Sequence, residues 1–260
     1  VTATRTPLML KDTPIITRVI TAKDIQRRGV ATLQQALEGE LAGVEFHQAG
    51  YGSSLSFQGL DARYVLFLVD GERIAGETYG NIDYARIPMD NIARIEIVRG
   101  ASSVLYGSNA MGGVINIVTR KMQEDAVSTD VNIGYGSFNT LQTEASNRVK
   151  AGKFSSVVTG SYNRSDGHRK DMGFEQYGGY AKLGWDINRR WNAWADINLT
   201  HFNASNPGSV TAPVIDNDSR ITRGMTSVTL RNDYGTTSGA LGFFCNWGLH
   251  KINDGYSAGE

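Results

Sequence analysis

The chain has 260 residues with 26 basic and 26 acidic side chains, which allows one large or two modest domains and disfavours a nucleic-acid partner, because positive charge is not in excess. Its one cysteine, Cys245, excludes an intrachain disulfide and a cysteine metal cluster. No run of about eighteen apolar residues occurs, so the sequence excludes a transmembrane helix but not a transmembrane barrel, whose strands need only alternate.

Two short helices are predicted near the start of the chain, over about 22–28 and 33–39. Each begins at a capping-box pair: Thr21 with Asp24, and Thr32 with Gln35. The helices are expected to end at Gly29 and Gly39.

Five strands and a long loop are predicted in the rest of the first 122 residues. The strands cover 43–48, 54–58, 64–71, 92–100 and 114–120. The near-continuous apolar run "YVLFLVDG" at 64–71 is typical of a strand covered on both faces. The segment 72–91 predicts a long loop, and such loops in compact domains are usually functional or disordered. Together these elements indicate a mixed α/β domain.

The glycine-rich stretch "GASSVLYGSNAMGGVINIVTR" at 100–120 raises the question of phosphate binding. Gly107 and Gly112 have P-loop spacing, but Gly113 and Val114 stand where the lysine and the hydroxyl are needed. A P-loop also opens a helix, whereas these glycines lead into a strand. We interpret them as structural glycines that permit tight turns and close backbone approach.

Beyond about residue 126, seven segments with period-two alternation follow one another. They cover about 127–136, 140–150, 154–165, 177–187, 190–202, 221–234 and 238–251. Each is long enough to cross a bilayer when tilted, which takes about 9–11 residues. In the fifth, Ile197 and Leu199 share an apolar face while Asp196 and Asn198 share a polar one. That pattern is typical of outer-membrane strands.

The connections between these segments differ in length. Tight ones are predicted at 151–153, 188–190 and 235–237, and longer ones at 166–176 and 203–220. Short turns on one side and long loops on the other favour a membrane barrel over a soluble sheet. Seven strands with polar inner faces cannot close a small packed barrel, since about eight strands leave room only for side chains. We therefore expect the chain to be the front part of a longer protein.

The runs "LDARYVLFLVDGERI" and "IPMDNIARIEIVRGASSVLYGSNAMGGVINIVTRK" closely resemble the plug domain of TonB-dependent outer-membrane receptors. The resemblance implies an α+β plug domain over 1–122, followed over 123–260 by the first antiparallel strands of a transmembrane β-barrel. Such a chain would be the N-terminal part of a plugged barrel of about 22 strands.

The same resemblance implies energy-coupled import of a scarce nutrient across the outer membrane of a Gram-negative bacterium. The stretch "VTATRTP" is similar to the end of the TonB box, so Val1, Thr2 and Ala3 are the expected coupling residues. The implied partners are TonB, outer-membrane lipid, a small-molecule nutrient and a surface lipoprotein, with no nucleic acid. No resident cofactor is implied; haem, cobalamin, a ferric siderophore or a glycan would be the transported ligand. The alternative is a non-transporting surface-binding or signalling receptor with the same plug.

Three positions depart from the family pattern: Ala42, Gln58 and Ala101. Gln58 matters most, because family members use plug arginines to pair with barrel glutamates and a glutamine cannot form that ion pair. The candidates that remain for plug–barrel electrostatics are Arg63, Arg94, Glu96 and Arg99. Residues 94 and 96 share one face of a strand, so Glu96 pairs either with Arg94 or with a barrel cation. A solvated charged face is the alternative.

Ligand contacts are expected at two plug apices, 48–53 and 72–83, because the family binds its substrate on the outward side. The candidates are His47, Gln48, Tyr51, Arg73, Glu77, Tyr79 and Asn81. Aromatic groups beside hydrogen-bonding groups suit a compact ligand, and His47 could ligate haem iron. Each of them could equally be an ordinary solvated loop residue.

No metal site or enzyme is predicted. The four histidines are too scattered for a metal cluster. No Ser-His-Asp or paired-carboxylate arrangement can be assembled, and Ser102 and Ser103 lack the flanking glycines of a nucleophile elbow.

Overall fold

The computed structural model describes residues 17–28, 33–41, 43–49, 52–73, 89, 92–99, 110–120 and 125–257. The chain divides into two compact units, residues 1–121 and 122–260, and each is described by itself. No helix in the described part of the chain is long and apolar enough to cross a membrane.

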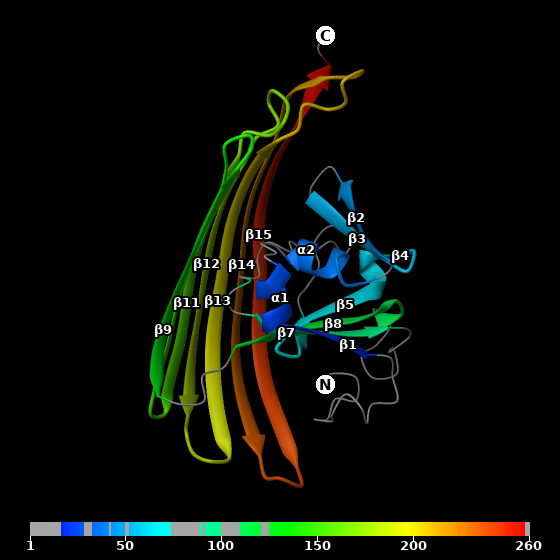
Figure 1. The fold of residues 1–260 in the computed structure, drawn as a ribbon. Helices are drawn as coiled ribbons and strands as arrows, with labels where there is room; N and C mark the ends of the chain where they lie inside the picture. The colour runs from blue at the N-terminus through cyan, green and yellow to red at the C-terminus, as the bar shows by residue number, and fades with distance from the viewer. Residues whose placement is uncertain are drawn as a thin grey trace. The chain divides into compact units, whose positions relative to one another are not determined.

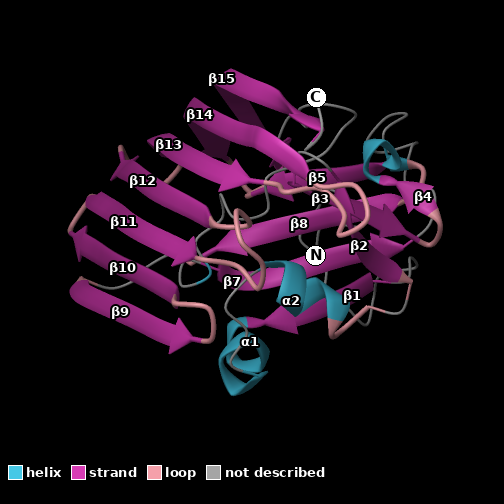
Figure 2. Ribbon diagram, turned by 90° about the horizontal axis from the view of Figure 1, so that it is seen from above, coloured by secondary structure: helices cyan, strands magenta, loops and turns pink. Residues whose placement is uncertain are grey.

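The first unit is built on a five-stranded mixed sheet with the order β1-β7-β8-β5-β6. Figure 2 labels its strands β1, β7, β8 and β5. Its strands are β1 (Thr17–Thr21), β5 (Val65–Val69), β6 (Glu72–Arg73), β7 (Ile92–Arg99) and β8 (Gly113–Thr119). β5 runs parallel to β8, and the other pairs are antiparallel. The central strands β5, β7 and β8 are buried over most of their length.

Both faces of this sheet are covered, as the apolar run of β5 predicts. Val65 and Phe67 face the larger hydrophobic core, whereas Leu66 and Leu68 face a smaller one. The larger core also takes in the buried side of two short helices, α1 (Ala22–Arg28) and α2 (Leu33–Glu38).

The capping box predicted for α1 is confirmed. The Thr21 hydroxyl accepts a hydrogen bond from the Asp24 backbone N–H at 3.3 Å, and the Asp24 carboxylate accepts the Thr21 backbone N–H at 3.1 Å. Each side chain thus satisfies a backbone donor of the other residue. Thr32, the first half of the second predicted pair, lies outside the described residues.

A small antiparallel sheet completes the first unit. It joins β2 (Val44–Ala49), β3 (Gly52–Phe57) and β4 (Leu60–Asp61), and a 3₁₀ helix (Ala62–Tyr64) leads from it into β5. Leu55 and Phe57 are buried in the larger core, which fixes this sheet to the rest of the unit.

The second unit is one antiparallel sheet in which seven strands lie side by side in chain order (Figure 1). They are β9 (Ala126–Gly136), β10 (Thr140–Ala151), β11 (Phe154–Ser165), β12 (Phe174–Asp186), β13 (Trp191–Ser205), β14 (Val214–Asp233) and β15 (Ser238–Ser257). All seven predicted segments are confirmed as strands.

The polarity of the two faces of this sheet is the reverse of that in a water-soluble protein. Large apolar side chains are exposed, among them Ile133 at 74% and Phe243 at 70%. Polar side chains of the opposite face are buried, with Arg148 at 4% and Thr159 at 3% exposed. A water-soluble sheet would bury the first set and expose the second, so this sheet is built to place its apolar face against lipid.

Several boundaries predicted from the sequence are wrong. The strand β1 was not predicted at all, although "TRVIT" is rich in β-branched residues. The predicted loop 203–220 shrinks to 206–213, because β13 and β14 continue pairing through polar sequence up to Ser205 and Asp218. The pairing of strands is carried by the backbone, so it does not stop where side-chain alternation stops.

The interpretation of the glycine-rich stretch as structural is confirmed at Gly113, which starts β8 with a φ of +145°. A Cβ at this position would lie 2.5 Å from the Val98 carbonyl oxygen and 2.9 Å from the Phe57 ring. Both neighbours belong to packed strands, so neither can move aside cheaply.

Replacement of Gly113 by alanine is expected to destabilise the first unit by about 2–3 kcal/mol, because it adds a clash to a strained backbone. Hydrogen exchange of the β8 amides in the complete receptor measures this loss of local stability. Gly160→Ala serves as the control, since a Cβ there meets open space. Equal protection of β8 in both variants would contradict the close-approach argument.

Candidate functional site

The second predicted apex starts from a tight turn that the structure fixes firmly. β5 and β6 form a hairpin through the two-residue turn Asp70–Gly71, whose φ values of 52° and 87° are both positive. That is the turn type for which Asp-Gly is the preferred sequence. The Asp-Gly pair therefore carried a hairpin signal that the prediction of one long loop over 72–91 overlooked.

Hydrogen bonds to β8 anchor this turn. The Asp70 carboxylate accepts the Thr119 backbone N–H at 2.9 Å and the Thr119 hydroxyl at 2.6 Å. The Asn116 side-chain oxygen accepts the Gly71 N–H at 3.1 Å, and the Asp70 N–H donates to the Ile117 carbonyl at 2.9 Å. The segment that follows the turn thus leaves a rigid base, as binding loops on a scaffold commonly do.

The first predicted apex is the tip of the β2–β3 hairpin. Ala49 pairs with Gly52 across the tip, Gln48 pairs with Ser53, and His47 pairs with Ser54. The hairpin therefore carries its predicted ligand residues at the end farthest from the core residue Phe57.

The structure describes the predicted ligand residues only in part. His47 and Gln48 lie on β2 and Arg73 lies on β6, and only their backbone is described. Tyr51, Glu77, Tyr79 and Asn81 lie outside the described residues, as do the coupling residues Val1, Thr2 and Ala3. Their convergence on a ligand or on TonB stays a prediction.

Three of the four predicted electrostatic residues, Arg63, Arg94 and Glu96, have partners within the first unit. Arg94 donates to Glu96 at 2.7 Å, and the Glu96 side chain is 2% exposed against 45% for Arg94. Arg63 donates to Asp61 at 3.0 Å. Of the two pairings left open for Glu96, the structure shows the local one. A buried carboxylate needs such a partner, because desolvation without one costs several kcal/mol. Whether these residues also act on the barrel stays a prediction.

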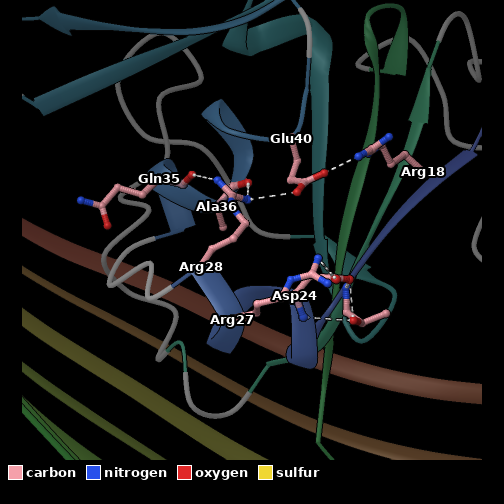
Figure 3. Close-up of polar contacts among 8 residues, drawn as sticks. Arg18, Asp24, Arg27, Arg28, Gln35, Ala36 and Glu40 are labelled. Carbon is pink, nitrogen blue, oxygen red and sulfur yellow. Dashed lines mark hydrogen bonds and ion pairs between the residues drawn. The ribbon is translucent and has the colours of Figure 1, made fainter.

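A cluster of ion pairs ties β1 to the helices (Figure 3). Glu40 accepts from Arg18 of β1 and lies 3.5 Å from Arg28 of α1. Arg28 also donates to the Gln35 and Ala36 carbonyls of α2, at 3.1 and 3.2 Å. A Cβ at position 39 would overlap the Arg28 guanidinium, so the glycine there makes room for it. We call Arg18, Arg28 and Glu40 the β1 clasp.

The capping residue Asp24 lies beside this clasp (Figure 3), and the pKa of its carboxyl is shifted. Hydrogen bonds from the Thr21 side chain and backbone lower the pKa of the Asp24 carboxyl, with help from the positive charges of Arg27 and Arg18. Arg27 donates to it at 3.0 Å. The carboxylate form is therefore the one that stabilises the start of α1.

In the second unit, the polar face of the sheet is held by side-chain contacts between different strands, some adjacent and some separated by one strand. Arg148 pairs with Asp130, and Lys150 pairs with Asp186. The Thr159 hydroxyl donates to Ser146 at 3.0 Å. These contacts satisfy buried polar groups within the sheet and leave a hydrogen-bonding surface suited to line a watery lumen.

Within the described residues, no group of three or more His, Cys, Asp or Glu side chains could hold a metal ion. The first unit is a plug-like domain that carries the β2–β3 hairpin and the anchored β5–β6 turn, and the second unit is a sheet with one apolar and one polar face.

Residues 9–114 match the family profile of the TonB-dependent Receptor Plug Domain. This chain belongs to the TonB-dependent receptors.

Curated relatives of this receptor chain include vitamin B12 transporters. The vitamin B12 transporter BtuB of Vibrio cholerae is 36% identical over 177 residues, which cover 67% of this chain and 28% of that protein. BtuB of Photobacterium profundum is 34% identical over 139 residues, covering 53% of this chain and 23% of that protein. The chain thus spans about a quarter of the length of these relatives.

Solved receptors share the fold. The siderophore receptor PirA from Pseudomonas aeruginosa has a TM-score of 0.70 at 21% identity, covering 91% of this chain and 41% of that one. FpvA of P. aeruginosa, bound to a pyoverdine, has a TM-score of 0.75 at 15% identity, covering 92% of this chain and 34% of that one. The receptor chain therefore has the fold of a plug domain followed by antiparallel barrel strands.

The lowered pKa of Asp24 predicts a sign for the acid response of the first unit. A carboxyl whose folded pKa lies below its usual 3.8 contributes stability that is full above the unfolded pKa and is lost as pH falls through the folded pKa. Protection of the α1 amides, corrected for intrinsic exchange, is expected to fall below about pH 4.

An Asp24→Asn variant tests this assignment. It is expected to show reduced α1 protection already at pH 7 and to lose the acid-dependent part of the response. Asp61→Asn is the control, because Asp61 is an exposed carboxylate whose side chain makes no capping hydrogen bond. An unchanged acid response in Asp24→Asn would show that another group is responsible.

Proposed function

We propose that this receptor imports a corrinoid of the vitamin B12 class across the outer membrane, with energy supplied through TonB. The observation that supports this substrate class is the 36% sequence identity to a vitamin B12 transporter over 177 residues, a stretch longer than the plug domain. The siderophore receptors are at or below 21% identity and support the fold alone.

The outer-membrane placement rests on the polarity of the seven-stranded sheet. A row of exposed apolar side chains on one face would be unfavourable in water by about 25 cal/mol for each Å². In a bilayer the same face is matched to its surroundings, and the backbone groups are already paired between strands. In the complete receptor, further strands would pair with the edges of β9 and β15 and close the barrel.

Energy coupling would reach the plug through β1. This strand is the first described element after the predicted coupling residues, and it lies at the edge of the plug sheet with β7 as its single neighbour. Beyond this pairing, β1 buries one side chain, Ile20, in the larger core. Its other ties are the β1 clasp and the Thr21–Asp24 capping box, which are polar contacts at the surface of the unit and worth little each. A pull on the N-terminus would therefore release β1 before it disturbs the buried strands β5, β7 and β8.

The two apices are the proposed ligand contacts. The β2–β3 tip carries His47 and Gln48, and the anchored β5–β6 turn starts the segment that carries Glu77, Tyr79 and Asn81. A rigid base under each apex limits the entropy lost when a ligand binds.

Spectroscopic titration of the complete receptor tests the substrate class. Cyanocobalamin is expected to bind saturably, and neither haemin nor ferrichrome is expected to displace it. A His47→Ala variant tests the haem alternative. If the wild-type receptor shows a saturable shift of the haemin absorbance band and this variant does not, the His47 imidazole is a ligand of the haem iron. Saturable binding of haemin or ferrichrome, without cobalamin binding, would overturn the proposal.

The coupling residues are tested by separating binding from uptake. Replacement of Val1, Thr2 and Ala3 by glycine is expected to leave cobalamin binding unchanged and to reduce uptake of labelled cobalamin by cells to background. Replacement of Ser209, Val210 and Thr211, in the β13–β14 loop, by glycine is the control and is expected to leave both binding and uptake unchanged. Binding without uptake by the wild-type receptor would support the non-transporting alternative.

A further inference from the structure

The lipid-facing side of the seven-stranded sheet is ordered in rows that run across the strands. Strand register places Ala145, Gly160, Gly179, Leu199, Gly224 and Trp247 in one such row. Another row holds Val149, Ser156, Leu183, Ala195, Val228 and Phe243. Apolar and small residues dominate these central rows, so they form a band without charge.

Aromatic side chains mark both ends of this band. Phe154 pairs with Trp185 at the end with tight turns, and their rings lie 6.5 Å apart. Tyr162 pairs with Tyr177 at the other end, with ring centroids 5.0 Å apart. Trp185 and Tyr177 are separated along β12 by about 26 Å, from a rise of roughly 3.3 Å per residue. At a barrel-strand tilt of about 35–45°, this length corresponds to a height of about 20 Å, slightly less than the apolar band of outer-membrane barrels, which is about 25 Å.

Immediately beyond Tyr162 and Tyr177, the composition of the rows changes. The next row on the same face holds Tyr135, Leu141, Arg164, Glu175, Asn203, Arg220 and Lys251. It crosses all seven strands and contains three cations and one anion. This row lies at the end that carries the longer connections, 166–173 and 206–213. Long connections mark the extracellular end of outer-membrane barrels.

The anion of this row is already engaged within the sheet. Glu175 accepts hydrogen bonds from Tyr162 at 2.8 Å and from Tyr177 at 2.7 Å. Arg164 donates to Asn139 at 3.0 Å. Glu175 lies two strands away from Arg220, with β13 between them.

Arg220 and Lys251 lie directly opposite each other on β14 and β15, and both side chains are exposed. Opposed side chains on antiparallel strands have Cβ atoms about 5 Å apart, and like charges in this position repel. Among the described side chains, no carboxylate is seen in an ion pair with either of them. An anion held between the two would turn this repulsion into attraction.

We propose that Arg220 and Lys251 bind the phosphate of a membrane lipid headgroup in the extracellular leaflet. The phosphate would accept hydrogen bonds from the Arg220 guanidinium and the Lys251 ammonium, which are the usual partners of phosphate oxygens. The acyl chains of the same lipid would lie along the neighbouring apolar rows, past Leu249, Trp247 and Phe243 of β15.

The continuity of the two surfaces favours a lipid over a soluble anion. Leu249 is two residues from Lys251 on the same face of β15 and is 57% exposed. A free phosphate would use the charges and leave this apolar surface uncovered, whereas a lipid covers both. The inference rests on the membrane placement proposed above, and it is independent of the transported substrate.

Native mass spectrometry of the detergent-solubilised complete receptor tests this site with phosphatidic acid and with diacylglycerol of the same acyl chains. These two probes differ only in the phosphate. Arg220→Gln/Lys251→Gln is expected to weaken phosphatidic acid binding about tenfold or more and to leave diacylglycerol binding unchanged. Arg189→Gln/Arg190→Gln, at the opposite end of the sheet, is the charge-matched control and is expected to retain at least most of the binding.

The outcomes separate this inference from the proposals on which it rests. Failure of the wild-type receptor to bind either lipid would overturn the membrane placement. Equal binding of both lipids by the wild-type receptor, or equal weakening in both double variants, would overturn the phosphate site alone. Full displacement of phosphatidic acid by millimolar glycerol phosphate would overturn the lipid as its source. Unchanged diacylglycerol binding by Arg220→Gln/Lys251→Gln reports that the variant is folded.

Discussion

The hydrogen-bonded ladder between consecutive antiparallel strands is the constraint on which the second unit depends. Each strand from β10 to β14 pairs on both sides, so the backbone polar groups between β9 and β15 find partners within the sheet. In hydrocarbon each unsatisfied group would cost several kcal/mol. Once the ladder meets this requirement, the side chains are free to carry opposite polarity on the two faces. One face can then contact lipid while Arg148, Thr159 and their neighbours form a hydrogen-bonded lining on the other.

The plug is stabilised in a different way, and its parts differ in strength. Strands β5, β7 and β8 are buried on both faces, and Gly113 and Asp70 fix their ends by close packing and by hydrogen bonds. The edge strand β1 is held by its pairing with β7, by the one side chain, Ile20, that it buries in the core, and by the polar contacts of the clasp. Local stability thus decreases from the sheet centre toward the N-terminus, which is the direction from which a transducing partner would pull. A rearrangement that begins at β1 can leave the base of the ligand apices in place.

The lipid-facing side of the sheet combines two kinds of recognition. Its central rows need only be apolar, because lipid chains contact them without directional bonds. The row that contains Arg164, Arg220 and Lys251 adds charge at the height where lipid headgroups begin. Such a row can fix the depth and tilt of the strands in the membrane, since aromatic and cationic anchors at the interface resist vertical displacement.

The sequence by itself determined the class of many elements and of the first domain, through the capping box at Thr21, the buried run of β5, the seven alternating strands and the resemblance of the plug. These follow from local chemistry, because periodicity and capping act over a few residues. Only the tertiary structure decided that β1 joins the sheet, that polar sequence extends β13 and β14, and that Asp70 reaches across to Thr119. It also brought Arg220 and Lys251 together. Such partners are far apart along the chain, and which of them meet depends on strand register, which turn geometry and the burial of one face set together.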